Sequence, residues 1–265
     1  MPATDDLQLL IEAAHASGDI ARMHFNASPE VWDKAGNAGP VTEADLAIDD
    51  MLRTNLLAAR ATYGWLSEET EDDSARLSRD RIFIVDPIDG TRAFIAGEQH
   101  FSHSLAIAES GRITTAVVYV PMMDLLFAAT DSSEATLNGA AIATSPQENL
   151  DGATVLATKP NLRPEYWIGD VPPIQRKFRP SLAYRLCLVA QGRYDAMLTL
   201  RDCWEWDIAA GDLLMREAGA TCTDKAGNRL RFNNRVPKLN GLIGAAPGVH
   251  SEISQRLEPA TSDFV

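Results

Sequence analysis

The sequence predicts a layered fold of the α/β or α+β class, in which helices and strands are intermixed along the whole chain. Residues 5–26 place apolar side chains at near-helical spacing, whereas residues 81–85 form a short apolar, β-branched run typical of a buried strand. Helix-like and strand-like segments recur in both halves, which favours layered packing. The chain has 265 residues, so one large or two modest domains are expected.

The first half is predicted to begin with two helices and to continue with strands. Thr42 and Asp45 have the form of a capping box, which opens a second helix that ends near Arg60. A loop over residues 36–40 precedes this helix. Further strands are expected at 101–109, 112–120 and 124–130, and a small hairpin at 131–146 with Asn138-Gly139 at its turn.

The second half is expected to begin near residues 146–152. No Gly/Ser-rich segment occurs there, so the boundary between residues 1–148 and 149–265 should not be a flexible linker. Five prolines make residues 160–180 irregular. Strands are predicted at 153–158, 194–199, 221–224 and 241–246, and helices at 182–191, 206–218 and 248–257.

The charge balance argues against a general nucleic-acid binder. Lys and Arg number 24 against 37 Asp and Glu, which gives a net charge of −13. General affinity for a phosphate backbone needs clustered positive charge. Only five of the 24 cations are lysines, and arginines suit local contacts with phosphate. A small phosphorylated metabolite is therefore compatible with this chain, whereas a nucleic acid polymer is not expected.

Cysteine usage and the absence of targeting signals favour the cytoplasm. Cys187, Cys203 and Cys222 are odd in number and form no C-x-x-C pair, so neither a disulfide framework nor a cysteine zinc site is expected. The first residues carry acids where a secretory signal has basic residues. No apolar run approaches the roughly 18 residues that a membrane span needs. We expect a cytoplasmic protein without a membrane partner.

Several common catalytic motifs are absent, so the carboxylates become the informative residues. The chain has no G-x-G-x-x-G, Walker P-loop, G-x-S-x-G or H-E-x-x-H motif. Its five histidines are scattered. His100 and His103 lie three residues apart in a predicted strand, where they would point to opposite faces and fit structural or surface roles.

The hexapeptide DPIDGT, residues 86–91, is the strongest local motif and directly follows the predicted buried strand. A tight turn at the strand end would hold Asp86 and Asp89 on one rim, stiffened by the proline. Gly90 would permit unusual dihedral angles, and the N–H groups of Gly90 and Thr91 at a helix start would favour phosphate. A D-x-x-D pair alone often only decorates a turn, but the whole motif after an apolar strand indicates a site.

Two further acidic segments accompany the hexapeptide. Glu68 and Glu69 open a run with five acids in the six positions 68–73, and Asp207 follows Trp206 at the start of an alanine-rich helix. Taken alone, the first would be a solvated loop and the second an aspartate favoured by the helix dipole. Together the three acidic segments suggest a hard-cation centre, because Mg²⁺ prefers oxygen ligands and no Cys/His cluster competes.

In order and spacing, these motifs resemble the inositol monophosphatase superfamily. The resemblance also includes the early V-T-x-x-D segment at residues 41–45 and covers nearly the whole chain. It implies a layered α-β-α-β-α sandwich of the inositol monophosphatase and fructose-1,6-bisphosphatase type. It also implies a Mg²⁺-dependent, lithium-sensitive phosphomonoesterase, commonly a homodimer.

The resemblance assigns metal-binding roles to single residues. One Mg²⁺ would be held by Glu68, Asp86 and the carbonyl of Ile88. A second would be held by Asp86, Asp89 and Asp207, so that Asp86 bridges the pair. Glu68 would also help to place a weaker third ion. In two-metal hydrolysis one ion lowers the pKa of a bound water and the other stabilises the leaving oxygen.

The same resemblance assigns the catalytic and substrate contacts. Thr91, partnered by Asp45, would orient and activate a water that attacks phosphorus in line, without a covalent phospho-enzyme. Glu69 is expected outside direct metal contact. The expected substrate contacts are Gly90, Thr91, Arg185 and Asp207.

Three branches of the superfamily differ in the leaving group. Leu200 stands where inositol monophosphatases commonly carry a glutamate for inositol hydroxyls. Histidinol-phosphate phosphatases share the wording D-G-T-R-A-F-I at 89–95 but usually depart from W-D-x-A-A-G, which this chain keeps. The segments 185–192 and 205–207 resemble the bacterial 3′(2′),5′-bisphosphate nucleotidases, although Ser181-Leu182 replaces their Gly-Ser pair.

These comparisons favour adenosine 3′,5′-bisphosphate as the substrate, with AMP as the product. Arg185 stands where the nucleotidases have a lysine and would meet the second phosphate, although an arginine on a helix surface is the plainer interpretation. Inositol 1-phosphate is the next candidate, followed by histidinol phosphate. A different class also stays open, a regulatory protein that binds RNA or RNA polymerase, but the intact acid set and the −13 charge argue against it.

Overall fold

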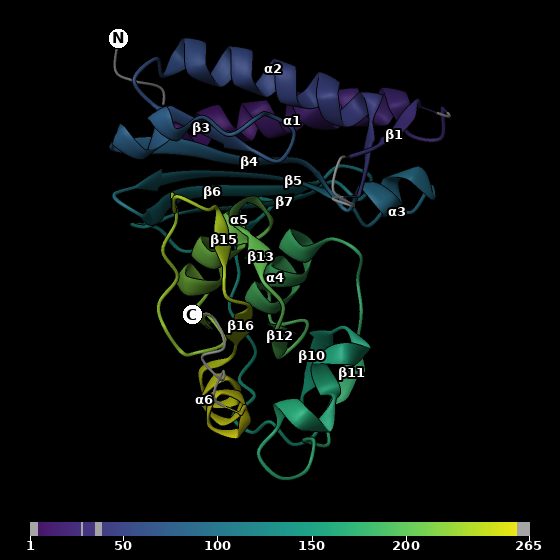
Figure 1. Cartoon of the computed structure of the whole chain (residues 1–265), viewed down its shortest axis with the longest axis vertical. Helices are drawn as coiled ribbons and strands as arrows, with labels where there is room; N and C mark the ends of the chain where they lie inside the picture. Colours follow the sequence, from purple (N-terminus) through teal and green to yellow (C-terminus); the bar gives the residue numbers. More distant parts are fainter. Residues whose placement is uncertain (1–4, 28, 35–38, 259–265) are drawn as a thin grey trace.

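Two long helices cover the outer face of the first sheet (Figure 1). The computed structural model describes residues 5–27, 29–34 and 39–258, so most of the predicted loop at 36–40 lies outside the described residues. Helix α1 (Asp6–His24) begins after Asp5, whose side chain accepts a hydrogen bond from the N–H of Leu7. Helix α2 (Glu43–Ala59) begins at the predicted capping box of Thr42 and Asp45, which is confirmed.

The first sheet has seven strands in the order β3-β4-β5-β6-β7-β8-β9. Strands β3 and β4 run parallel, and the remaining neighbours run antiparallel. The strands are β3 (Gly64–Ser67), β4 (Arg81–Asp89), β5 (Ser102–Glu109), β6 (Arg112–Val120), β7 (Leu125–Thr130), β8 (Thr136–Leu137) and β9 (Ala140–Ala141). Between β8 and β9, Asn138 and Gly139 both have positive φ, as the predicted hairpin turn requires.

Both faces of this sheet are covered, which explains the continuous apolar run in β4. Phe83 and Val85 pack in the cluster under α1 and α2, whereas Ile82 and Ile84 pack in the cluster on the opposite face. Because neighbouring side chains on a strand alternate between faces, a strand buried on both sides carries apolar residues at every position.

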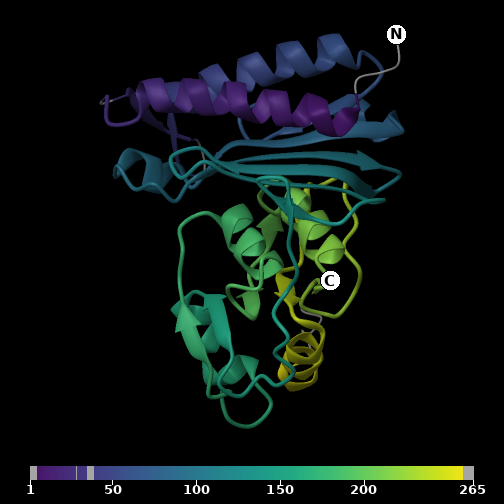
Figure 2. The same cartoon turned by 180° about the vertical axis from the view of Figure 1, so that it is seen from behind.

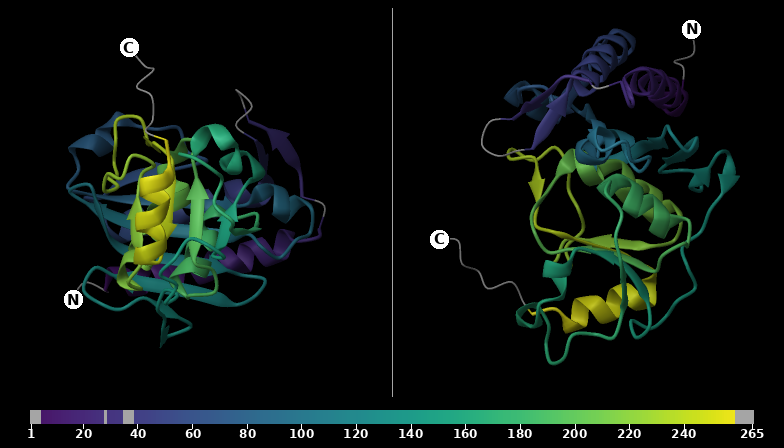
Figure 3. Two further views of the ribbon diagram at one scale, coloured as in Figure 1. Left: turned by 90° about the horizontal axis from the view of Figure 1, so that it is seen from below. Right: turned by 90° about the vertical axis from the view of Figure 1, so that its right-hand side faces the viewer.

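Helices α4 (Leu182–Ala190) and α5 (Glu205–Glu217) form the middle layer between the two sheets (Figures 1 and 2). They pack closely, because a Cβ on Gly211 of α5 would overlap the side chain of Leu186 in α4. The second sheet has the strand order β11-β10-β12-β16-β14, and α6 (Pro247–Arg256) lies across its far side (Figure 3). Its strands are β10 (Thr154–Ala157), β11 (Gln175–Lys177), β12 (Ala196–Thr199), β14 (Thr221–Thr223) and β16 (Leu242–Ala245).

The predicted α-β-α-β-α sandwich is confirmed by these five layers. The irregular segment 160–180 was predicted without a strand, yet it contains β11 at the sheet edge, where prolines nearby interrupt no central ladder. The short remaining elements are β1 (Val31–Asp33), β2 (Pro40–Thr42), η2 (Ser74–Ser78), α3 (Thr91–Ile95), η3 (Lys159–Leu162), η4 (Pro164–Tyr166), β13 (Cys203–Trp204) and β15 (Lys238–Leu239).

The first sheet ends at β9 and the second begins at β10, and the division of the chain near residue 148 stays a prediction. Cys187, Cys203 and Cys222 are all buried thiols without disulfides, as expected. None of the helices that the structure describes combines the length and apolar character that crossing a bilayer requires.

Candidate active site

The DPIDGT motif lies in the last part of β4 and the start of α3. The prediction of a tight turn after residue 85 was wrong, because the strand continues to Asp89. Asp86 pairs with Ser104, and Asp89 pairs with Ser102. Between these two pairs, β4 therefore has one more residue than β5. The extra residue makes an irregularity of the β-bulge kind, which redirects side chains at a strand end.

A buried histidine of the neighbouring strand β5 donates a hydrogen bond to the bulge. The ring Nδ1 of His103 donates to the carbonyl of Pro87 at 2.5 Å. Burial lowers the pKa of His103 to about 4, so the ring is neutral at pH 7. His103 therefore has a structural role, as the sequence predicted, and its companion His100 stacks on the ring of Tyr184.

Three carboxylates from different elements converge beside the bulge. Glu68 follows β3, Asp86 lies in β4, and Asp207 lies in the first turn of α5; one oxygen of each lies within 4.8 Å of the others. Asp86 is 1% exposed, and its Oδ1 atom is buried without a hydrogen-bond partner. A buried acceptor without a donor is costly, and a hard cation would satisfy it.

Burial and mutual repulsion disfavour the charged forms of these acids. Burial raises the pKa of Asp86 well above its usual range, and the charge of Glu68 raises it further. Burial of its carboxylate also raises the pKa of Asp207 well above the usual range, with further contributions from Asp89 and Glu68. A divalent cation would offset this repulsion, so the donor set fits Mg²⁺.

Asp89, a predicted metal ligand, lies outside the cluster of Glu68, Asp86 and Asp207, although its charge acts on Asp86; one of its oxygens contacts the middle layer. Its Oδ2 atom accepts hydrogen bonds from the hydroxyl of Ser181 and from the backbone N–H of Ala183, the latter at 2.6 Å. Burial raises the pKa of Asp89 to about 6, although these bonds favour the charged form. With Oδ2 used at the start of α4, Oδ1 is the oxygen that could meet a cation.

Thr91 at the start of α3 and Asp45 in the first turn of α2 lie in contact, as the resemblance implied. The Thr91 hydroxyl lies 3.2 Å from Asp45 Oδ1 and 3.1 Å from the carbonyl oxygen of Ile88. The Thr91 hydroxyl has one hydrogen and can donate it to only one of these two oxygens at a time. If a cation bound the Ile88 carbonyl oxygen, the Thr91 hydroxyl would donate to Asp45. Burial raises the pKa of Asp45 to about 6. Gly90 has φ of 102°, a conformation that glycine adopts without strain.

Lys34 is a site residue that sequence reasoning missed. Its ammonium group donates to Glu68 at 2.7 Å and to Glu69 at 2.6 Å. Burial raises the pKa of Glu69 to about 7, and the bond from Lys34 lowers it. Glu69 thus holds Lys34 and stands outside the three-carboxylate cluster. The only sequence signal for Lys34 was the scarcity of lysine.

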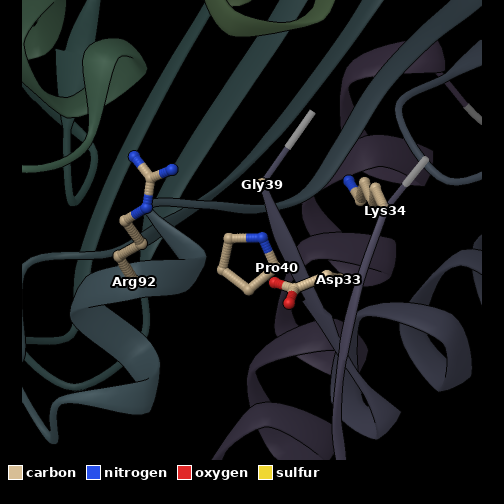
Figure 4. Close-up of a pocket in the computed structure, with 5 residues that line it drawn as sticks. All are labelled: Asp33, Lys34, Gly39, Pro40 and Arg92. Atoms are coloured by element: carbon tan, nitrogen blue, oxygen red, sulfur yellow. The ribbon is translucent and has the colours of Figure 1, made fainter. Parts of the chain in front are cut away.

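A pocket of about 470 Å³ opens next to Lys34 (Figure 4). It is lined by Arg92 of α3 on one side and by Asp33, Lys34, Gly39 and Pro40 of the β1–β2 hairpin on the other. Arg92 directly follows Thr91 in α3, but neither Thr91 nor Asp45 is among the residues that line this pocket. Its walls carry the cations Lys34 and Arg92 and the anion Asp33, and Lys34 already donates to Glu68 and Glu69.

Arg185 is not an arginine on a helix surface, which was the alternative interpretation of the sequence. It is buried, its Nε and Nη2 atoms donate to the carbonyls of Arg179 and Pro180, and its guanidinium lies 4.4 Å from the Phe178 ring centroid. Burial lowers its pKa to about 10, against the attraction of Asp89. Two of its donor atoms therefore already serve the loop before α4.

Comparison with known proteins identifies the family of the chain. A family model described as the inositol monophosphatase family matches residues 4–261. An inositol-1-monophosphatase of Rhizobium meliloti (strain 1021) is 37% identical over 232 residues, 83% of this chain and 86% of that protein. A Nus factor SuhB of Pasteurella multocida (strain Pm70) is 31% identical over 273 residues, 97% of each chain. The solved structure of a Thermotoga maritima IMPase matches with a TM-score of 0.81 and 26% identity, over 95% of this chain and 96% of that one. The chain therefore belongs to the inositol monophosphatase family, whose members are phosphomonoester hydrolases that generally depend on Mg²⁺.

Proposed function

We propose that this protein hydrolyses a small phosphomonoester at the cluster of Glu68, Asp86 and Asp207. The observation that carries the proposal is the convergence of these carboxylates around an Asp86 oxygen without a hydrogen-bond donor. Bound Mg²⁺ would supply positive charge at the phosphate and lower the pKa of a water molecule. Glu68, Asp86 and the Ile88 carbonyl would hold one ion and Asp86, Asp89 and Asp207 another, with Glu68 helping to place a third.

The residues of the chain then position the reactants. With a cation on the Ile88 carbonyl, Asp45 would accept the Thr91 hydroxyl hydrogen, which leaves the Thr91 oxygen free to accept a hydrogen bond from the attacking water. The first intrahelical bonds of α3 run from Ala93 and Phe94 to the Gly90 carbonyl, so the N–H of Thr91 has no partner within the helix. That N–H group and its Gly90 neighbour would hold phosphate oxygens.

Adenosine 3′,5′-bisphosphate is the first substrate that we propose. It rests on the resemblance of the segments around Arg185 and Glu205-Trp206-Asp207 to the nucleotidases. Arg185 lies close enough to Asp89 for the carboxylate charge to raise its pKa, so the guanidinium lies near the proposed centre. Arg185 could then meet the second phosphate with the donor atom that the backbone carbonyls leave.

Inositol 1-phosphate is the second candidate, favoured by two observations. The 37% identical relative is named an inositol-1-monophosphatase. In addition, the commitment of Arg185 to the Arg179 and Pro180 carbonyls weakens the case for a bisphosphate. Against it, Leu200 offers no carboxylate for inositol hydroxyls; its backbone N–H donates to Asn161 Oδ1 at 3.2 Å. Histidinol phosphate is the third candidate.

Turnover of the three substrates by the purified protein tests the proposal. With Mg²⁺, we expect release of inorganic phosphate from at least one of them, and no release in excess chelator. Millimolar Li⁺ at fixed Mg²⁺ is expected to inhibit, as in the family that the sequence resembles. A higher kcat/KM for adenosine 3′,5′-bisphosphate supports the first candidate, and Arg185→Ala should then reduce that preference. No release from any phosphomonoester would reject the enzymatic proposal.

The alternative from a different functional class is a regulatory protein that binds RNA or RNA polymerase. One relative is named a Nus factor, and it matches 97% of this chain. The intact carboxylate cluster argues that catalysis is retained, and the −13 net charge argues against broad RNA affinity. A homodimer and a cytoplasmic location stay predictions; sedimentation of the purified protein tests the first and cell fractionation the second.

A further inference from the structure

Helix α2 presents two aspartates, one turn apart, toward the site. Asp45 and Asp49 differ by four positions and so lie on the same helix face. Asp45 accepts the Thr91 hydroxyl, as described above. Asp49 is 8% exposed and belongs to neither the carboxylate cluster nor the proposed mechanism. Its partners lie in the turn that carries Glu68.

One carboxylate holds both ends of that turn. Ser67 donates from its hydroxyl to Asp49 Oδ1 at 2.5 Å, and Thr70 donates to Asp49 Oδ2 at 2.5 Å. Glu68 and Glu69 are the two residues between these anchors. The indole N–H of Trp65 donates to Thr70 Oγ1 at 3.2 Å, so the Thr70 hydroxyl is fixed on both sides. The backbone N–H of Glu68 donates to the Val85 carbonyl at 3.2 Å, which ties the turn to β4.

We propose that Asp49 is a positioning residue that sets the place of Glu68 and thereby the Mg²⁺ affinity of the centre. Hydrogen bonds to a carboxylate are stronger than neutral ones, so the Asp49 clamp limits the movement of the turn. Groups that orient metal ligands typically change metal affinity by about 10- to 100-fold. This inference rests on the proposed metal function of Glu68.

The test is Mg²⁺ binding by the full chain without substrate, measured by titration calorimetry. Asp49→Asn should weaken Mg²⁺ binding about 10- to 100-fold, while kcat at saturating Mg²⁺ changes little. Asp50→Asn is the matched control, because it removes the same charge from the next, exposed position of α2. Its Mg²⁺ affinity should equal that of the wild type.

Thr70 provides an independent arm if Asp49→Asn does not fold. Thr70→Ser keeps the hydroxyl and should keep the Mg²⁺ affinity, whereas Thr70→Val keeps the shape but should weaken binding. A purely structural clamp would lower the melting temperature without changing the affinity. Unchanged Mg²⁺ affinity in Asp49→Asn, or in Thr70→Val if the former does not fold, overturns the inference. A wild type that binds no Mg²⁺ rejects the proposed function and this inference together, which is a separate outcome.

Discussion

The Asp89 carboxylate accepts a hydrogen bond of 2.6 Å from the backbone N–H of Ala183, so a residue of the first sheet holds the start of a helix in the middle layer. The Ser181 hydroxyl donates to the same oxygen and also accepts from the N–H of Tyr184 at 3.0 Å. The N-terminus of a helix favours a negative charge. Asp89 therefore joins the proposed metal centre to the packing of α4.

Ser181→Ala should lower the free energy of unfolding by about 1–2 kcal/mol, because it removes the helix cap of α4. It also removes one bond that favours the charged form of Asp89, so the pKa of Asp89 should rise further. Urea unfolding in the presence of chelator measures the first effect apart from metal binding. Stability equal to that of the wild type would show that Ser181 does not hold this layer contact.

Asp86→Asn should abolish phosphate release and yet raise the melting temperature in excess chelator. The pKa of Asp86 is raised in the folded state, so its charged form opposes folding at neutral pH, and the amide removes that charge. Each kcal/mol gained corresponds to about 2–4 °C for a chain of this size. Differential scanning calorimetry with and without Mg²⁺ measures the melting temperatures of the wild type and of Asp86→Asn. Mg²⁺ should stabilise the wild type only; a lower melting temperature for the variant in chelator contradicts the assignment.

Thr91→Ala should lower kcat by about 100-fold or more and change KM little. A hydroxyl that orients the attacking water acts mainly in the transition state. Thr91→Ser keeps the hydroxyl and should retain most of the activity. Initial rates at saturating Mg²⁺ measure both constants. If only KM rises, Thr91 contacts the phosphate and does not orient water.

His103 should make the protein less stable in mild acid. Its pKa falls from about 6.5 in the unfolded chain to about 4 in the folded one, so protonation favours unfolding. Its contribution is complete above pH 6.5 and is lost as the pH falls toward 4, by up to about 3 kcal/mol. The check is the difference in unfolding free energy between the wild type and His103→Gln at several pH values in chelator. If the unfolding free energies of the wild type and His103→Gln change with pH in parallel, His103 is not a buried neutral ring.

Much of this architecture could be predicted because it follows from local pattern. The apolar spacing of α1, the capping box of Thr42 and Asp45, and the apolar run of β4 each depend on a few neighbouring residues. The resemblance carried by the acidic motifs implied a shared centre for Glu68, Asp86, Asp89 and Asp207, and the structure brings Glu68, Asp86 and Asp207 together. The bulge in β4 could not be predicted, because it depends on the register against β5, and residues 86–91 contain a proline and a glycine that also suit a turn.

The acidic run at 68–73 shows why single roles are harder to predict. Its acids were compatible with a solvated loop, yet four of them have different tasks that depend on distant partners. Glu68 joins the carboxylate cluster, Glu69 binds Lys34, Asp72 binds Arg76 at 2.6 Å, and Asp73 caps η2. The contacts of Asp49 and Arg185 likewise depend on which segments the fold brings together.

A comparison of two single-charge variants tests whether Glu68 belongs to a Mg²⁺ centre that hydrolyses a phosphomonoester. Phosphate release is measured for the wild type, Glu68→Gln and Glu71→Gln, each with Mg²⁺ and with excess chelator. Glu71 is an exposed acid of the same run, so it controls for the loss of one charge. We expect release only with Mg²⁺, at wild-type rate in Glu71→Gln and at least about 100-fold slower in Glu68→Gln, because a bound metal ion contributes several kcal/mol of transition-state stabilisation. Equal rates in the two variants, or full release in chelator, would show that hydrolysis does not depend on a Mg²⁺ centre at Glu68.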